Sequence, residues 1–374
     1  MNKSCLIVIW LMASLFVNLL VGGELAIAQD VTVPAATPAT QTAALAGSPA
    51  ASAATPATQT AASAGSAATR AVTGQVEVIA PVRRPRIVLA LGGGGARGAA
   101  HLGVLRVLEK EGIPVDMIAG TSMGAIVGGL YAAGLSPDQI QTLFFNNTLF
   151  HSYMTVPIFI RVLAMPLFGL ARLTGRHPYD GFYRGNKFAN YLNDAVPDDQ
   201  IEVSKLKIPF WAVCTNLLDG QPYAIKNGNF GRALQASSAI PVLRRPVPLD
   251  NKLLVDGFIV ANVPVEQARA MGGDIVVAVS VDESLKALPE EAFRKTGSVS
   301  HRIFNLFLTR YDLPRLEKAD IVIAPDVDGI GLLSRNKDDA RASIAAGEEA
   351  TRKMIPAIRA KLQSYMAANP AGQK

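Results

Sequence analysis

Residues 87–98 read IVLALGGGGARG, an apolar run followed by four glycines, an alanine, an arginine and a fifth glycine. A helix-compatible pattern follows at 99–111, so this stretch predicts a strand, a tight turn and a helix. A second unit of the same kind has a strand-like run at 115–119, a turn at 120–124 and a helical pattern at 125–133. Such alternation predicts an α/β fold, a sheet with helices on both faces.

Further strands are predicted C-terminal to these two units, and a long helix closes the pattern. The strands are expected at 209–215, 222–226, 253–255, 274–281 and 320–324, and the helix at 337–362. One α/β domain over residues 84–365 accommodates all of them, and leaves 366–374 as a tail.

The composition is that of a globular protein. Of the 374 residues 49% are hydrophobic and 18% are charged, which excludes disorder throughout the chain. The formal net charge of +6 comes from scattered Lys and Arg residues rather than from one basic tract. We therefore expect no nucleic-acid partner, while the charge permits a weak preference for anionic membrane surfaces.

The N-terminus predicts export. Lys3 precedes an apolar run at 5–21, and Ala26-Ile27-Ala28 forms a small-residue cleavage site, so residues 1–28 are interpreted as a signal peptide. The destination would be the periplasm, the outer membrane or the medium. The alternative is an uncleaved membrane anchor, because residues 5–22 are about as long as the minimum bilayer span.

Residues 29–83 are predicted to form a disordered linker, since they are mostly Ala, Thr, Pro, Ser, Gly and Gln. Near-identical segments at 36–48 and 54–66 form a tandem repeat without an apolar face, which is typical of a spacer. Cys5 leaves with the signal peptide, so the sequence predicts no intrachain disulfide. Cys214 lies in an apolar run and is interpreted as a small core residue, with a nucleophilic role as the alternative.

The turn Gly120-Thr121-Ser122-Met123-Gly124 matches G-x-S-x-G between a predicted strand and a predicted helix. Small residues such as Gly120 and Gly124 let the backbone turn sharply and project the serine hydroxyl. Ser122 is therefore the candidate nucleophile. The alternative is an ordinary glycine-rich turn.

The first glycine-rich turn predicts an anion site, because successive backbone N–H groups there can point at one position. Such a nest suits an oxyanion hole; the candidate residues are Gly93, Gly94, Gly95, Arg97 and Gly98.

The same turn also matches the dinucleotide-binding pattern G-x-G-x-x-G. That pattern requires an acidic residue at the end of the second strand, whereas Asp116 lies at the wrong end. A phosphate-binding P-loop is excluded because Arg97-Gly98-Ala99 replaces the required Gly-Lys-Ser/Thr.

The candidate base for Ser122 is Asp256, which ends the apolar strand 253–255 and precedes Gly257. A carboxylate within hydrogen-bond reach can accept the serine proton directly, and burial would raise its pKa towards a useful range. In α/β-hydrolase triads the order along the chain is serine, acidic residue, histidine. Of the four histidines only His301 lies C-terminal to both Ser122 and Asp256. His301 is therefore the alternative base.

Three motifs in this order, residues 93–98, 120–124 and Asp256-Gly257, together with Ala236-Ser237-Ser238-Ala239-Ile240-Pro241, resemble the patatin-like phospholipase family. The resemblance covers about residues 84–280. It implies a three-layer α/β/α fold with a central, mostly parallel sheet, a Ser122–Asp256 dyad, an oxyanion hole from the glycine loop, and hydrolysis of lipid acyl esters without a metal or cofactor. One departure is Phe258, since the family commonly has Gly or Ala there; its ring would narrow the site or line an acyl pocket.

Residues 144–173 are unusually apolar and are expected to cap an acyl pocket, to touch a membrane transiently, or to form a buried helix. Three function classes follow for a lipid or phospholipid ligand: an acyl hydrolase, an acyltransferase using the same dyad, and a non-catalytic lipid-binding module. The sequence leaves the oligomeric state and the headgroup preference open.

Overall fold

The computed structural model describes residues 84–146, 148–155, 179–295 and 297–369. The predicted signal peptide and linker, residues 1–83, lie outside the described residues. So do residues 156–178, which include 156–173 of the apolar segment, and residues 370–374 of the predicted tail.

Eight strands of the described residues form one sheet in the order β5-β6-β3-β2-β1-β7-β8, with β4 also paired to β3. The parallel strands are β1 (Ile87–Leu91), β2 (Met117–Thr121), β3 (Phe210–Asn216), β7 (Ile275–Val279) and β8 (Ile321–Ile323). The antiparallel strands are β4 (Pro222–Ile225), β5 (Val247–Leu249) and β6 (Lys252–Asp256). The sheet is therefore mixed and mostly parallel.

Helices cover both faces of the sheet because the central strands are apolar on both sides. Ile87, Leu89 and Leu91 of β1 join one core cluster, and Val88 and Ala90 join the other. The first face carries α2 (Ala100–Lys110), α3 (Met123–Ala132), α4 (Pro137–Phe145), α5 (Thr148–Tyr153), α8 (Asn186–Asp194), α9 (Phe230–Ser237) and α13 (Lys337–Ala368). The second face carries α10 (Phe258–Ala261), α11 (Val265–Ala270) and α12 (Ser298–Leu316).

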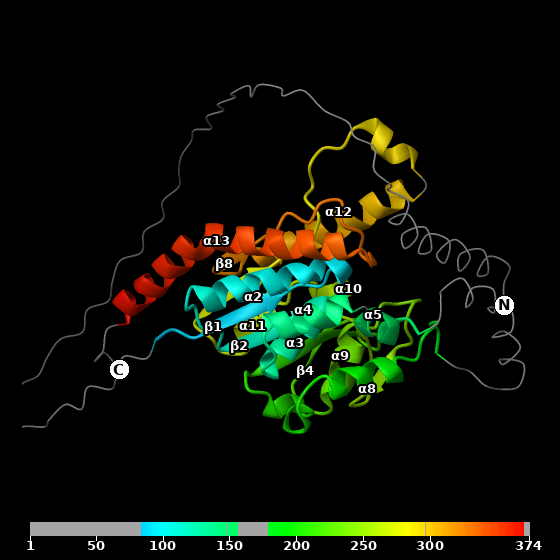
Figure 1. Cartoon of the computed structure of the whole chain (residues 1–374), viewed down its shortest axis with the longest axis horizontal. Helices are drawn as coiled ribbons and strands as arrows, with labels where there is room; N and C mark the ends of the chain where they lie inside the picture. The colour runs from blue at the N-terminus through cyan, green and yellow to red at the C-terminus, as the bar shows by residue number, and fades with distance from the viewer. Residues whose placement is uncertain (1–83, 147, 156–178, 296, 370–374) are drawn as a thin grey trace, which may run out of the picture. The chain divides into compact units, whose positions relative to one another are not determined.

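In Figure 1, α13 runs along α2 on the first face. The two meet closely at glycines, because a Cβ on Gly103 would lie 2.1 Å from the Ile344 carbonyl oxygen. Short 3-10 helices, η1 to η4, complete the fold; their bounds are Gly95–Ala99, Asp198–Gln200, Val203–Lys205 and Glu290–Arg294. Within the described ranges, no helix combines the length and apolarity needed to cross a bilayer.

The predicted strands are confirmed with shifts of up to two residues at their ends. β2 begins at Met117 rather than at residue 115 and ends at Thr121, so Ser122 immediately follows the strand. β5 was not predicted, because its sequence Val-Pro-Leu is short and contains proline. α13 ends at Ala368, beyond the predicted domain end at residue 365.

Candidate active site

Ser122 stands on a sharp turn between β2 and α3. Its φ of 52° and ψ of −119° are unusual for a residue with a side chain and are held by the packing around the turn. A Cβ on Gly120 would lie 2.6 Å from the Gly124 carbonyl oxygen, and one on Gly124 would lie 2.3 Å from the Leu91 carbonyl oxygen. Both flanking positions therefore require glycine, and the geometry is that of a nucleophile elbow.

Asp256, the last residue of β6, reaches Ser122 across β3. The register places Thr121 opposite Val213 and Asp256 opposite Cys214, so the two strand ends flank the same part of β3. The Ser122 hydroxyl donates to Asp256 Oδ2 at 2.6 Å, and the Phe258 N–H donates to Oδ1 at 3.1 Å. Burial raises the pKa of Asp256 to about 7, although both hydrogen bonds oppose that shift.

Neighbouring polar groups fix the backbone on both sides of this contact. Ser237, at the end of α9, accepts a hydrogen bond from the Ser122 N–H at 3.1 Å and donates to the Val213 carbonyl at 2.6 Å. The Thr215 hydroxyl donates to the Asp256 carbonyl at 2.9 Å. Ser237 belongs to the segment that carried the family resemblance, but its role required the structure.

The glycine loop passes directly beside the nucleophile. A Cβ on Gly93 would lie 3.1 Å from Ser122 Cβ and 2.8 Å from Asn262 Oδ1, so only glycine fits there. Gly98 packs against Met123, since a Cβ there would lie 2.4 Å from Met123 Cγ. The structure therefore brings this loop and Ser122 together, as the sequence predicted.

The N–H groups of the loop divide into engaged and unengaged donors. The Gly93 N–H donates to the Asn262 carbonyl at 3.1 Å, and the Arg97 N–H donates to the Gly94 carbonyl at 3.1 Å. Those two N–H groups are therefore not open to a ligand, which corrects the expectation for Gly93 and Arg97. Gly94 and Gly95 donate to no described residue, and Gly95 lines the cavity beside Ser122.

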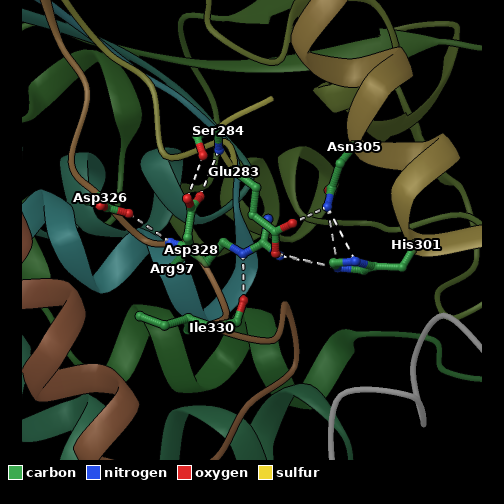
Figure 2. A network of polar contacts seen from close by, with 8 residues as sticks. All are labelled: Arg97, Glu283, Ser284, His301, Asn305, Asp326, Asp328 and Ile330. Atoms are coloured by element: carbon green, nitrogen blue, oxygen red, sulfur yellow. Dashed lines mark hydrogen bonds and ion pairs between the residues drawn. The ribbon is translucent and has the colours of Figure 1, made fainter. Parts of the chain in front are cut away.

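The Arg97 side chain is buried and holds the loop in place instead of facing the cavity. Its Nε donates to the Ile330 carbonyl at 2.6 Å, and its Nη2 donates to Glu283 Oε1. Figure 2 shows His301 and Asn305 reaching from α12 towards this ion pair. His301 therefore contacts Arg97, Glu283 and Asn305, whereas the Ser122 hydroxyl is bonded to Asp256.

A buried amide that the sequence did not reveal supports the loop from the second face of the sheet. The Asn262 carbonyl accepts from Gly93, and its side-chain amide donates to Asp282 at 3.0 Å and to Asp312 at 2.8 Å. Burial, together with the nearby Asp282, raises the pKa of Asp312 to about 7. No motif marks Asn262, because its partners lie 20 and 50 residues along the chain.

Cys214 and His101, two residues of reactive type, are packed in the interior. Cys214 is buried in β3, and burial raises the pKa of its thiol, as expected of a core residue. His101 lies fully buried in α2 and bonds the Gly92 carbonyl through Nε2 at 2.8 Å. Burial lowers the pKa of His101 to about 4, so its neutral ring donates to that carbonyl.

A cavity of about 40 Å³ adjoins Ser122 and is lined by Gly95, Met123, Ile126, Leu149, Phe150, Tyr153, Phe188, Ser238, Ile240, Leu332 and Leu333. Its lining is apolar, as an acyl chain requires, but its volume is far below the ~300 Å³ of typical ligand pockets. Phe258 is not part of this lining. Its ring contacts Phe304 of α12 at a centroid distance of 5.8 Å, so it packs on the helix instead of narrowing the site.

Residues 89–269 match the model of the patatin-like phospholipase family. The chain carries a patatin-like phospholipase domain. The mixed, mostly parallel sheet between two helical layers agrees with the three-layer patatin-like fold expected from the sequence.

Relatives of this patatin-like domain occur in bacteria and mammals. An uncharacterized NTE family protein of Mycobacterium tuberculosis is 34% identical over 200 residues, which cover 54% of this chain and 50% of the relative. Human patatin-like phospholipase domain-containing protein 6 is 32% identical over 197 residues, which cover 52% of this chain and 13% of that protein. The chain thus spans half or less of the length of these relatives.

Among solved structures, VipD from Legionella pneumophila is 14% identical with a TM-score of 0.40, covering 74% of this chain and 67% of that one.

Proposed function

We propose that this chain hydrolyses acyl esters of lipids, with Ser122 as the nucleophile and Asp256 as its base. The hydrogen bond from the Ser122 hydroxyl to Asp256 at 2.6 Å, on a strained turn beside the glycine loop, carries this proposal. Because burial brings the pKa of Asp256 to about 7, the carboxyl group is suited to accept and return a proton near neutral pH.

In the proposed reaction, Ser122 Oγ attacks the ester carbonyl carbon while Asp256 accepts its proton. The oxyanion is stabilised by the N–H groups of Gly94 and Gly95, together with the Met123 N–H at the start of α3. Asp256 then protonates the departing alcohol, and the acyl group remains on Ser122. A water molecule, deprotonated by Asp256, then attacks this ester. Asp256 returns that proton to Ser122 Oγ as the bond to the acyl group breaks and the fatty acid leaves.

The test compares hydrolysis of a p-nitrophenyl acyl ester and of a phospholipid by wild type, Ser122→Ala, Asp256→Asn and His301→Ala. We expect the first two substitutions to lower kcat by roughly 10³-fold or more. His301→Ala should retain most of the activity. Turnover that survives Ser122→Ala contradicts the dyad, and turnover lost only with His301→Ala restores the histidine as base.

The same assay addresses the two other function classes. An acyltransferase would pass the acyl group from Ser122 to an added alcohol faster than to water, so product analysis by mass spectrometry separates it from a hydrolase. A non-catalytic lipid-binding module would bind the lipid without release of fatty acid. The intact Ser122–Asp256 contact favours catalysis.

We further propose that α12 is where the enzyme contacts membranes. Val299, Ile303 and Phe307 follow each other at four-residue spacing on one helix face, and the latter two are 61% and 60% exposed. The helix also carries Arg302 and Arg310, whereas its single acidic residue, Asp312, is fully buried. Apolar side chains beside arginines, without exposed carboxylates, suit an anionic lipid surface.

Vesicle sedimentation tests this surface. We expect wild type to bind vesicles of phosphatidylglycerol more tightly than vesicles of phosphatidylcholine, and Ile303→Ser/Phe307→Ser to lose that binding while keeping hydrolysis of the soluble ester. Leu218→Ser, at a 66% exposed position outside α12, is the matched control. If the double variant instead converts a dimer into a monomer and binds vesicles normally, the face joins two copies and the proposal is wrong.

The proposed export rests on residues 1–28 alone. N-terminal sequencing of the protein from the cell envelope or medium should begin at Gln29 if the signal peptide is cleaved after Ala28. A chain that retains Met1 in the membrane fraction supports the anchor instead.

A further inference from the structure

Arg244 is a buried arginine without a counterion among the described residues. Only 1% of its surface is exposed, and its guanidinium lies 3.9 Å from the ring centroid of Tyr153 and 4.6 Å from that of Phe188. Nη2 donates to the Tyr153 carbonyl at 2.7 Å, whereas Nε and Nη1 are buried and have no hydrogen-bond partner there. Burial lowers the pKa of Arg244, because desolvation penalises its charged form.

The comparison with Arg97 shows how unusual this is. Arg97 is equally buried, but Glu283 and the Ile330 carbonyl bind its N–H groups. A buried charge without a paired anion costs free energy, and each unsatisfied buried donor adds to that cost. The aromatic rings offset part of that cost for Arg244. Two unpaired donors remain, and they suit an anion that arrives with a ligand.

Arg244 borders a cavity of about 410 Å³ that shares Tyr153 with the cavity beside the nucleophile. Arg184, Lys187 and Arg245 line the same cavity, and none of its described lining residues is acidic. The charged residues of the described lining are therefore all cationic.

The start of α8 adds a second positive feature to this cavity. The nine-residue helix begins at Asn186, and its N-cap, Gly185, provides no side chain to cap the first N–H groups. Gly185, Asn186 and Lys187 line the cavity. A Cβ on Gly185 would lie 2.8 Å from Arg244 Nη1, so the guanidinium adjoins the helix start. An uncapped helix N-terminus beside a guanidinium is a favourable place for a phosphate.

We propose that this cavity binds a phosphate group, and that the phosphate is the headgroup phosphodiester of the lipid whose ester reacts at Ser122. The assignment rests on the proposed hydrolase function and narrows its substrate class to phospholipids. Tyr153 lines both cavities, so the two ends of one lipid could occupy them together, with the acyl ester at Ser122 and the phosphate at Arg244. Arg244 is a specificity-determining residue in this scheme and takes no part in bond cleavage.

The first experiment compares hydrolysis of dihexanoyl phosphatidylglycerol and dihexanoylglycerol, both as monomers, by wild type and Arg244→Met. Methionine keeps an apolar stem against Tyr153 and Phe188 and removes the charge. We expect KM for the phospholipid to rise about tenfold or more with little change in kcat, and KM for the diacylglycerol to stay constant. Arg341→Gln, at an exposed site on α13, should behave as wild type.

The second experiment measures the thermal stability of the same proteins with inorganic phosphate. We expect phosphate to raise the Tm of wild type and of Ser122→Ala, but not that of Arg244→Met. Lys187→Gln, at an exposed position of the same cavity, should weaken the shift without risk to the fold. An equal shift in wild type and both cavity variants means an adventitious ion only, and overturns the site.

Together, the two experiments distinguish a lipid headgroup from free phosphate as the ligand. They also test the phosphate site separately from the proposed hydrolase activity. One result is that phosphate raises the Tm only when Arg244 is present, while Arg244→Met still discriminates between the two lipids as wild type does. That result assigns the cavity to free phosphate and overturns the headgroup assignment. If wild type cleaves neither lipid, the hydrolase proposal fails, while the Tm measurement still decides whether the cavity binds phosphate.

Discussion

The nucleophile and its base are held by the sheet, whereas the glycine loop beside them is held by contacts to distant parts of the chain. Ser122 directly follows β2 and Asp256 is the last residue of β6, and their approach is set by pairing with β3. The loop depends on Asn262, Glu283 and Ile330, which lie more than 150 residues further along the chain. Both regions border one small cavity.

Because of this difference, we expect the Ser122–Asp256 pair and the glycine loop to respond differently to single substitutions. Strand register is backed by many backbone hydrogen bonds and buried apolar residues, so single changes near β2 and β6 should leave the geometry of the pair intact. The loop is not part of the strand pairing, and single backbone hydrogen bonds tie it to Val279, Asn262 and Leu332. Changing one residue of the loop or one of its partners should therefore displace its N–H groups. The following substitutions test this separation.

Gly93→Ala should disrupt the point where the two regions touch. The new methyl group would collide with Asn262 Oδ1 and crowd Ser122, which forces the loop away from the nucleophile. Loss of oxyanion donors typically lowers kcat by about 10²–10³-fold, and we expect that range here. Steady-state kinetics on the p-nitrophenyl ester, with circular dichroism to confirm folding, measures it. Near-normal kcat in a folded variant would show that the loop can shift freely.

Arg97→Met should remove the contacts of the glycine loop with Glu283 and with the Ile330 carbonyl. It leaves Glu283 largely buried without its cation, so we expect a loss of about 3 kcal/mol in the free energy of unfolding. At a temperature where the variant is folded, kcat should fall by roughly 10²-fold because the loop loses its anchor. Urea denaturation and kinetics check the two effects. Unchanged kcat in the destabilised protein would mean that Arg97 serves stability alone.

The pH dependence of kcat/KM should report the ionisation of Asp256 in the Ser122–Asp256 pair. Asp256 must be ionised to accept the Ser122 proton, and its pKa of about 7 predicts that activity rises with pH across neutrality. Below that pKa the ionised fraction falls about tenfold per pH unit, so kcat/KM at pH 6 should be roughly a tenth of its plateau. A profile of kcat/KM from pH 5 to 9 measures this rise. Activity that is flat down to pH 5 contradicts the raised pKa.

Ser237→Ala should give the smallest effect, because it removes one hydrogen bond to the Ser122 N–H while the strand still holds the turn. A net contribution of about 1 kcal/mol corresponds to a loss of roughly fivefold in kcat. Ser238→Ala is the matched control, since that hydroxyl bonds the Leu234 carbonyl. Equal losses in both variants would indicate general loosening of α9 instead of an effect on Ser122.

How far the sequence predicts this site depends on the range of the contacts involved. The nucleophile elbow was predictable because its cause, a glycine on each side of Ser122, lies within five residues. The engagement of the Gly93 and Arg97 N–H groups was not, because it requires Asn262 and the exact turn of the loop. Phe258 illustrates the same limit: its bulk was evident, but only the packing of α12 against α10 decides where the ring lies.

The amino-acid order alone predicts the alternation of strands and helices, the candidate pair Ser122 and Asp256, and the glycine loop before them. These follow from local periodicity and from the steric limits of glycine-rich turns, which act over a few residues. Three features needed the folded chain: which loop N–H groups stay unengaged, the contact of His301 with Arg97 and Glu283, and the burial of Arg244 without a counterion among the described residues. Those features depend on which side chains meet across the folded chain, and burial sets their electrostatic consequences only after that meeting.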